Sequence, residues 1–84
     1  MDNMTMEDYL NKKDTVQDQM DDLIFELIKA RKEQGITKEQ LSQLAGIPLH
    51  TIAAYEGFQI HPTLETLIKA ANALQCAITI QKQS

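Results

Sequence analysis

The sequence predicts an all-α domain, a bundle of four to five helices followed by one short β-strand near the C-terminus. Three observations lead to this prediction. Apolar residues recur every three or four positions through most of the chain, as they do on the buried face of a helix. Gly and Pro fall between these periodic segments, where helices end and begin. Near the C-terminus the apolar period changes to two, which is typical of a strand.

The size and composition fit one small domain. The chain has 84 residues, of which 43% are hydrophobic, and a core this small has little stability to spare, so we expect a homodimer. It lacks the run of about 20 apolar residues that spans a bilayer and an apolar leader at its start. We therefore expect a cytoplasmic protein with no membrane partner.

The net charge of −4 is unevenly distributed. Up to Asp22 there are seven acids and two lysines, whereas the remainder has six bases and five acids. We predict an acidic N-terminal arm or short helix over residues 1–14 and a folded domain over residues 15–84. The near-neutral domain permits DNA binding, but it lacks the strongly basic surface that would favour it.

The first long helix is predicted to begin after Asp14 or Thr15, either of which would cap it, and to stop at Gly35. Acids crowd its first turns and bases its last, as the helix dipole favours. Its apolar stripe consists of Val16, Met20, Leu23, Ile24, Leu27 and Ile28.

A second helix is predicted from about Lys38 to Ala45. Thr37 and Gln40 have the spacing of a capping box. The buried residues would be Leu41, Leu44 and Ala45.

Gly46 allows a tight turn into a third helix. Pro48 suits the first turn of that helix, which we expect to run to about Tyr55 or Glu56 and to bury Ile52 and Tyr55. Gly57 would break it.

A fourth helix is predicted from about Leu64 to Leu74, capped by Thr63. Its buried face would comprise Leu64, Leu67, Ile68, Ala71 and Leu74.

The predicted strand covers residues 77–81, with Ile78 and Ile80 on one side. A lone strand has an open edge that invites pairing with a second copy or with another protein's sheet. The single cysteine, Cys76, excludes an internal disulfide and thiolate-rich metal sites. We place Cys76 in the core or, with Ile78 and Ile80, in a dimer interface.

The second and third helices, joined by a short turn with Gly, have helix-turn-helix geometry. Ala45 is small where the two helices would cross, and Ile47 and Ile52 would fill the space between them. The helix from Pro48 to Tyr55 would then be the one that enters the DNA major groove.

The segment ITKEQLSQLAGIPLHTIAAYE, followed by HPTLETLIKAANAL, resembles Cro/C1-type repressors of the XRE family. The resemblance covers about Leu27 to Leu74 and implies a lambda-repressor-like fold. The flanks MEDYLNKKDTVQDQM and ALQCAITI resemble host-inhibition-of-growth (HigA-like) antitoxins, and the second flank also resembles HipB-like antitoxins. These likenesses imply a sequence-specific transcriptional repressor that binds a double-stranded DNA operator. It would be the antitoxin of a HigBA-like toxin-antitoxin pair that autoregulates its operon and neutralises a small, basic, mRNA-cleaving toxin.

The resemblance also assigns a DNA-binding set. Lys38 and the amides around Thr37 would hold phosphates, while Leu49, His50 and Thr51 would face bases. For Thr51, a hydroxyl that stabilises the helix is an equal alternative. The DNA backbone would be flanked by Lys29, Arg31 and Lys32. The full predicted set is Thr37, Lys38, Pro48, Leu49, His50, Thr51, Ala53, Ala54 and Gln59.

Several positions depart from the family pattern. Lys38 replaces the usual Gln, and Pro48 replaces a Ser. The reading face lacks Arg and Gln, and only His50 among the four base-reading positions can form a hydrogen bond. The family glycine that follows Glu56 by two residues is Phe58 here, so an exposed Phe58 is unexpected.

A second hypothesis follows from the apolar reading face. The chain would then be a protein-interaction module on a helix-turn-helix scaffold, using its acidic N-terminal segment and C-terminal edge. The acidic segment is either a solvated surface or a nucleic-acid mimic that docks on a basic toxin. No catalytic or metal-ligand spacing is present, so we expect neither an enzyme nor a cofactor.

Overall fold

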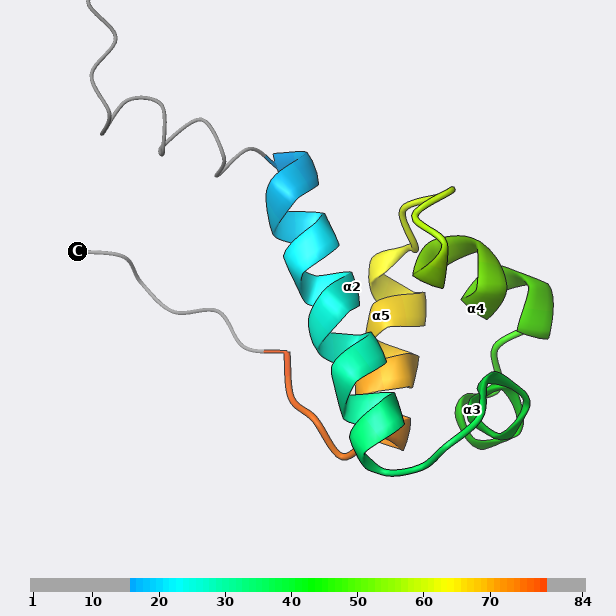
Figure 1. Cartoon of the computed structure of the whole chain (residues 1–84). Coiled ribbons are helices and arrows are strands. Elements are labelled where there is room, and N and C mark those ends of the chain that lie inside the picture. Colours follow the sequence, from blue (N-terminus) through cyan, green and yellow to red (C-terminus); the bar gives the residue numbers. More distant parts are fainter. Residues whose placement is uncertain (1–15, 79–84) are drawn as a thin grey trace, which may run out of the picture.

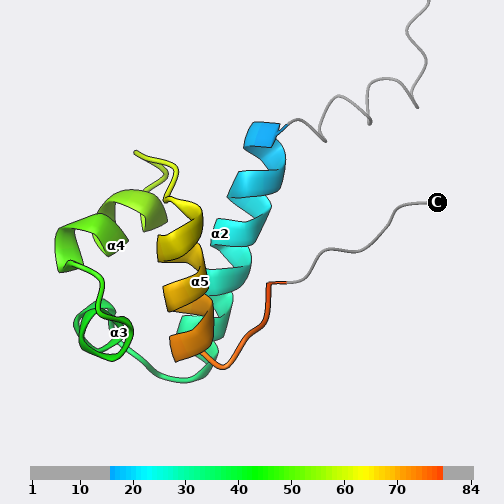
Figure 2. The ribbon, with the colours of Figure 1, turned by 180° about the vertical axis from the view of Figure 1, so that it is seen from behind.

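Four helices form the domain in the computed structural model, which describes residues 16–78. They are α2 (Val16–Glu33), α3 (Lys38–Ala45), α4 (Leu49–Glu56) and α5 (Leu64–Ala73). Figure 1 shows α2 alongside α5, with α3 and α4 forming the opposite side, and Figure 2 shows the same arrangement from behind. The predicted helices are confirmed. α4 begins one residue later than predicted, because Pro48 has an extended ψ of 140° and caps the helix from outside.

One apolar core joins the four helices. α3 packs against both α4 and α5, and α2 packs against α4. The buried residues are Ile24, Leu27, Leu41, Ile47, Ile52, Tyr55, Leu67, Ala70, Ala71 and Leu74. None of the helices formed by residues 16–78 is long and apolar enough to cross a membrane.

All four helices end in the same way. After each helix, a residue in the left-handed region turns the chain, and the next N–H bonds to a carbonyl five residues back. Glycine occupies that position after α2 (Gly35) and after α3 (Gly46). After α4 and α5 the positions are held by Phe58, with φ 58°, and Gln75, with φ 59°. The predicted stops at Gly35 and Gly46 are confirmed, and Gly57 is the C-cap of α4.

The apolar periodicity predicted more buried residues than the structure has. Val16 is exposed because α2, with 18 residues, is longer than the helices that pack on it. Leu44 is 63% exposed and lines an open hollow with Ile36 and Gln40. Leu64 and Ile68 are also exposed, because Leu67, Ala70 and Ala71 are the residues that α5 turns to the core.

The predicted strand is not supported. Ala77 and Ile78 have no strand conformation, and no strand occurs among residues 16–78. The rest of the predicted strand, residues 79–81, lies outside the described part of the chain, as do the predicted arm at 1–14 and Ile80. Residues 16–78 contain no other strand that could supply the ladder hydrogen bonds, which explains why Ala77 and Ile78 are not part of a sheet within this range.

Candidate nucleic-acid interface

The first surface of the candidate interface is the start of α3. The Thr37 hydroxyl accepts a hydrogen bond from the Gln40 N–H at 3.0 Å, and the Thr37 N–H donates to the Gln40 side-chain oxygen at 2.9 Å. This confirms the capping box. It fixes the exposed helix terminus, where backbone N–H groups and the half-buried Lys38 meet the solvent. Such a terminus favours an anion, so this end of α3 can hold a phosphate.

The turn between α3 and α4 sets the angle of the second helix. Gly46 has φ 71°, a conformation that glycine adopts without steric cost. The Ser42 hydroxyl donates to the Ile47 carbonyl at 2.5 Å, and the Ile47 side chain is buried. The turn is therefore held from both sides, by a side-chain hydrogen bond and by an apolar contact.

α4 is anchored by its inner face. Ile52 and Tyr55 are completely buried, as predicted. The Tyr55 hydroxyl has no hydrogen-bond partner among residues 16–78. Burial, and secondarily the nearby Glu56 carboxylate, raise the pKa of Tyr55 to about 12.

An ion pair fixes the end of α4 to α2. Arg31 Nε and Nη2 donate to the two Glu56 carboxylate oxygens, each at 2.8 Å. A third donor, Nη1, reaches the Ile36 carbonyl at 2.8 Å. The hydrogen bond to Glu56 is the largest cause that raises the pKa of Arg31 above its ordinary value. One guanidinium therefore ties together α2, the α2–α3 loop and α4.

The prediction that Arg31 flanks DNA is wrong. The residue is only 7% exposed because Glu56 and Ile36 engage it inside the fold. In the sequence, Arg31 was explained by its favourable position in the last turn of a helix. Its partner Glu56, 25 residues away, was not predicted. The available signal was Glu56, a carboxylate placed directly after a buried Tyr55. Lys29 and Lys32 are exposed on α2.

The outward side of α4 is mostly apolar. Leu49, His50 and Ala53 are exposed, whereas Thr51 and Ala54 are half-buried. Pro48, at the N-cap, is exposed and provides no side-chain cap. The main-chain donors at the start of α4 are therefore not taken up by a capping side chain, and a phosphate can approach them.

Gln59 lies in the loop after α4. Its side chain is exposed, and its N–H donates to the Ala54 carbonyl at 2.9 Å. The predicted residues therefore occupy three neighbouring elements: the start of α3, the outer side of α4 and the loop that follows α4. The arrangement can place a helix against a groove and amide donors against phosphates.

The predicted dimer residues are on a different segment. Cys76 is exposed, so its placement in the core is wrong, because the chain turns away from the bundle at Gln75. Ile78 is exposed in the coil that follows α5. Within residues 16–78 no group of three or more His, Cys, Asp or Glu side chains is placed to hold a metal ion.

Comparisons with known proteins agree with this geometry. The HTH_3 family, described as helix-turn-helix, matches residues 27–81. A protein of Haemophilus influenzae, named an uncharacterized HTH-type transcriptional regulator, is 41% identical over 58 residues. The aligned part is 69% of this chain and 59% of that relative, so the chain spans about three fifths of the relative's length. No solved structure matches the chain.

Proposed function

The chain belongs to the HTH_3 family of helix-turn-helix proteins, and we propose that it is a sequence-specific DNA-binding transcriptional repressor that acts as a homodimer. The supporting observation is the pose of α4. Its inner face is held by Ile52, Tyr55 and Glu56, and its outer face is open to solvent. A dimer would set two such helices in successive major grooves, about 34 Å apart.

Binding affinity in this proposal comes mainly from phosphates. Lys38 and the N–H groups at the starts of α3 and α4 bind phosphates of the DNA backbone. Gln59 contacts the DNA next to them. Leu49 meets a thymine methyl, His50 forms the polar base contact, and Ala53 and Ala54 allow close approach. Thr51 contributes through its hydroxyl, to DNA or to the helix.

The test is selection of DNA sequences from a random pool, followed by titration at several salt concentrations. Lys38→Ala should weaken binding to all sequences and lower the salt slope by about one. Lys69→Ala is the control, because Lys69 pairs with Glu65 on α5. Equal affinity for selected and random DNA would contradict specific reading.

His50 supplies a separate test of base reading. His50→Ala should cost about 1–3 kcal/mol against the preferred base and relax the preference at that position. His61→Ala, in the α4–α5 loop, is the matched control. An unchanged preference in the His50 variant would remove this residue from the reading set.

We further propose an antitoxin role. It is supported by the resemblance of the flanks and by the acidity of residues 1–22, which would suit a small basic toxin. The chain should restore growth when co-expressed with a small basic protein from the neighbouring reading frame. The absence of such a frame, or failure of rescue, would leave a stand-alone regulator. The C-terminal dimer contact through Cys76, Ile78 and Ile80 belongs to the same proposal.

One observation favours a second function. The outer side of α4 has few hydrogen-bonding side chains, as expected for a protein-interaction module on a helix-turn-helix scaffold. Undetectable DNA binding at low salt, together with retained binding of a protein partner, would favour this alternative. Neither function requires catalysis.

A further inference from the structure

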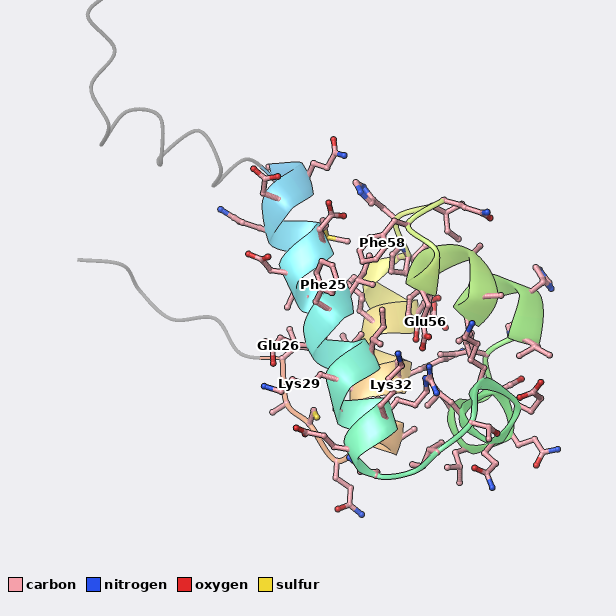
Figure 3. The ribbon with its side chains drawn as sticks, viewed as in Figure 1. Phe25, Glu26, Lys29, Lys32, Glu56 and Phe58 are labelled. Atoms are coloured by element: carbon pink, nitrogen blue, oxygen red, sulfur yellow. The ribbon has the colours of Figure 1, made fainter. Side chains whose placement is uncertain are left out.

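An aromatic pair lies on the surface of α2 and the loop after α4. The rings of Phe25 and Phe58 are 4.9 Å apart between centroids and tilted by 45°. Phe25 is 58% exposed and Phe58 is 41% exposed. Figure 3 shows the two rings side by side, with Lys32 farther along the same side of α2. A large aromatic pair left in water is the kind of centre around which protein interfaces form.

Four of the charges on α2 are arranged symmetrically about Phe25, whereas Asp22, Glu26 and Glu33 lie outside this pattern. Asp18 and Asp21 lie seven and four residues before Phe25, and Lys29 and Lys32 lie four and seven residues after it. Positions four and seven apart share one face of a helix. We call these five residues the α2 seam. One half of the seam is acidic, the other half is basic, and the apolar residue lies at the centre.

This pattern is complementary to itself. When a second copy of α2 is turned antiparallel about Phe25, the acidic half of one helix meets the basic half of the other. Asp21 then faces the partner's Lys29, and the two Phe25 rings meet at the two-fold axis. A parallel pairing would instead place like charges together, which is unfavourable.

The basic half of the seam is available to a partner. Within residues 16–78 neither Lys29 nor Lys32 has an ion-pair partner, and Asp21 has only a distant one, His61 Nε2 at 3.9 Å. The set of residues predicted to contact DNA from Thr37 to Gln59 belongs to α3, α4 and the following loop. Lys29 and Lys32 of α2, which the sequence placed beside the DNA backbone, serve self-association in this proposal instead.

We propose that the α2 seam binds a second copy of this chain, with the two α2 helices antiparallel and crossing at Phe25. The charges select the partner and its direction, and the Phe25–Phe58 pair supplies the buried apolar centre. This interface rests on the homodimer of the proposed function, and it is an alternative to the C-terminal contact as the surface that forms that dimer.

The first experiment measures self-association by sedimentation equilibrium from micromolar to near-millimolar concentration. Phe25→Ser removes the central ring from both copies and should raise the dimer Kd at least about tenfold. Leu44→Ser is the matched control, since Leu44 is an equally exposed apolar residue on α3, and it should leave the Kd unchanged. Circular dichroism confirms that both variants fold.

The second experiment tests the charges. Asp21→Lys and Lys29→Asp should each weaken self-association, because each places like charges opposite one another in the homodimer. An equimolar mixture of the two variants should form heterodimers well above the statistical fraction, because every seam pair is then attractive. The double variant should associate like the original chain.

Three results would overturn the proposal. They are a chain that is monomeric at every concentration, equal Kd values for the Phe25 and Leu44 variants, and a mixture with only statistical heterodimer. The second of these results, together with dissociation by Ile78→Ser, would assign the dimer to the C-terminal segment instead. Equal Kd values for the Phe25 and Leu44 variants would overturn this interface alone, because none of these measurements uses DNA, and sequence-specific DNA binding would stand.

Discussion

The two helices of the helix-turn-helix unit are held by different means. α3 is fixed by its immediate neighbours, through the Thr37 capping box at its start and Gly46 at its end. α4 has no side-chain cap, ends at a non-glycine residue in the left-handed region, and depends on Arg31 from a distant part of the chain. The comparison teaches that the scaffold helix is determined locally, whereas the pose of the reading helix is determined by tertiary contacts.

The largest expected effect comes from breaking the distant anchor of α4. Arg31→Met leaves the Glu56 carboxylate buried without its partner and should lower the free energy of unfolding by about 3–5 kcal/mol. Urea denaturation measures this loss. The double variant Arg31→Met, Glu56→Leu should recover much of it, because no unpaired charge remains. A loss below about 1 kcal/mol in the single variant would show that α4 does not depend on this pair.

The next effect concerns the inner face of α4 and depends on pH. The pKa of Tyr55 is about 12 in the folded chain, against the ordinary value of 10.0. Folding therefore favours the neutral phenol, and this contribution is fully present below pH 10 and is lost as the pH rises through about 12. We expect the loss to reach roughly 2–3 kcal/mol.

Alkaline unfolding of Tyr55→Phe provides the control for this prediction. The variant lacks the titrating hydroxyl, so its stability should fall less between pH 10 and 12. At neutral pH it should be as stable as the original chain or slightly more stable, since the hydroxyl that is removed has no hydrogen-bond partner in the described part of the chain. Identical alkaline profiles for the two proteins would contradict the raised pKa.

A smaller effect tests the local anchor of α3. Thr37→Ala should cost about 1 kcal/mol through loss of the cap. Thr63→Ala removes the corresponding cap of α5 and should cost a similar amount. Gel shifts separate the two variants, because only the Thr37 variant should also weaken DNA binding. Equal DNA affinity in both would place the start of α3 away from the phosphates.

The smallest effects concern the two helix ends at which the left-handed residue is not glycine. Gln75→Gly relieves the left-handed strain and should stabilise the chain by about 1 kcal/mol. Phe58→Gly gains the same relief but loses the stacking on Phe25, which is worth about 0.5–1.5 kcal/mol, so its stability should hardly change. Thermal unfolding compares the two. If Phe58→Gly stabilised the chain as much as Gln75→Gly does, the aromatic pair would contribute nothing to the stability of the isolated chain.

The sequence predicted the four helices well because their start and stop signals are local. Thr37, Gly46 and Thr63 act within a few residues of their own position, so pattern reasoning finds them. It also identified Ile52 and Tyr55, because one amphipathic turn defines which side is buried.

Prediction failed where a residue's role depends on contacts far along the chain. Arg31 and Lys32 are neighbouring cations that the sequence pattern cannot distinguish. Arg31 is buried and Lys32 is exposed because only Arg31 contacts Glu56. Leu44 and Leu64 fit a helical stripe, but a small bundle offers no neighbour to cover them. The charge pattern around Phe25 is not visible when charges are counted by segment, and it appears only when they are placed on the faces of α2.

The bond between Arg31 and Glu56 also bears on the order in which the chain folds. α3 can form early because its stabilising partners are close in sequence. α4 reaches its final pose only after α2 has docked and closed a loop of 25 residues. We expect the reading helix to be the last part of the unit to consolidate during folding and the first to be released when the domain opens.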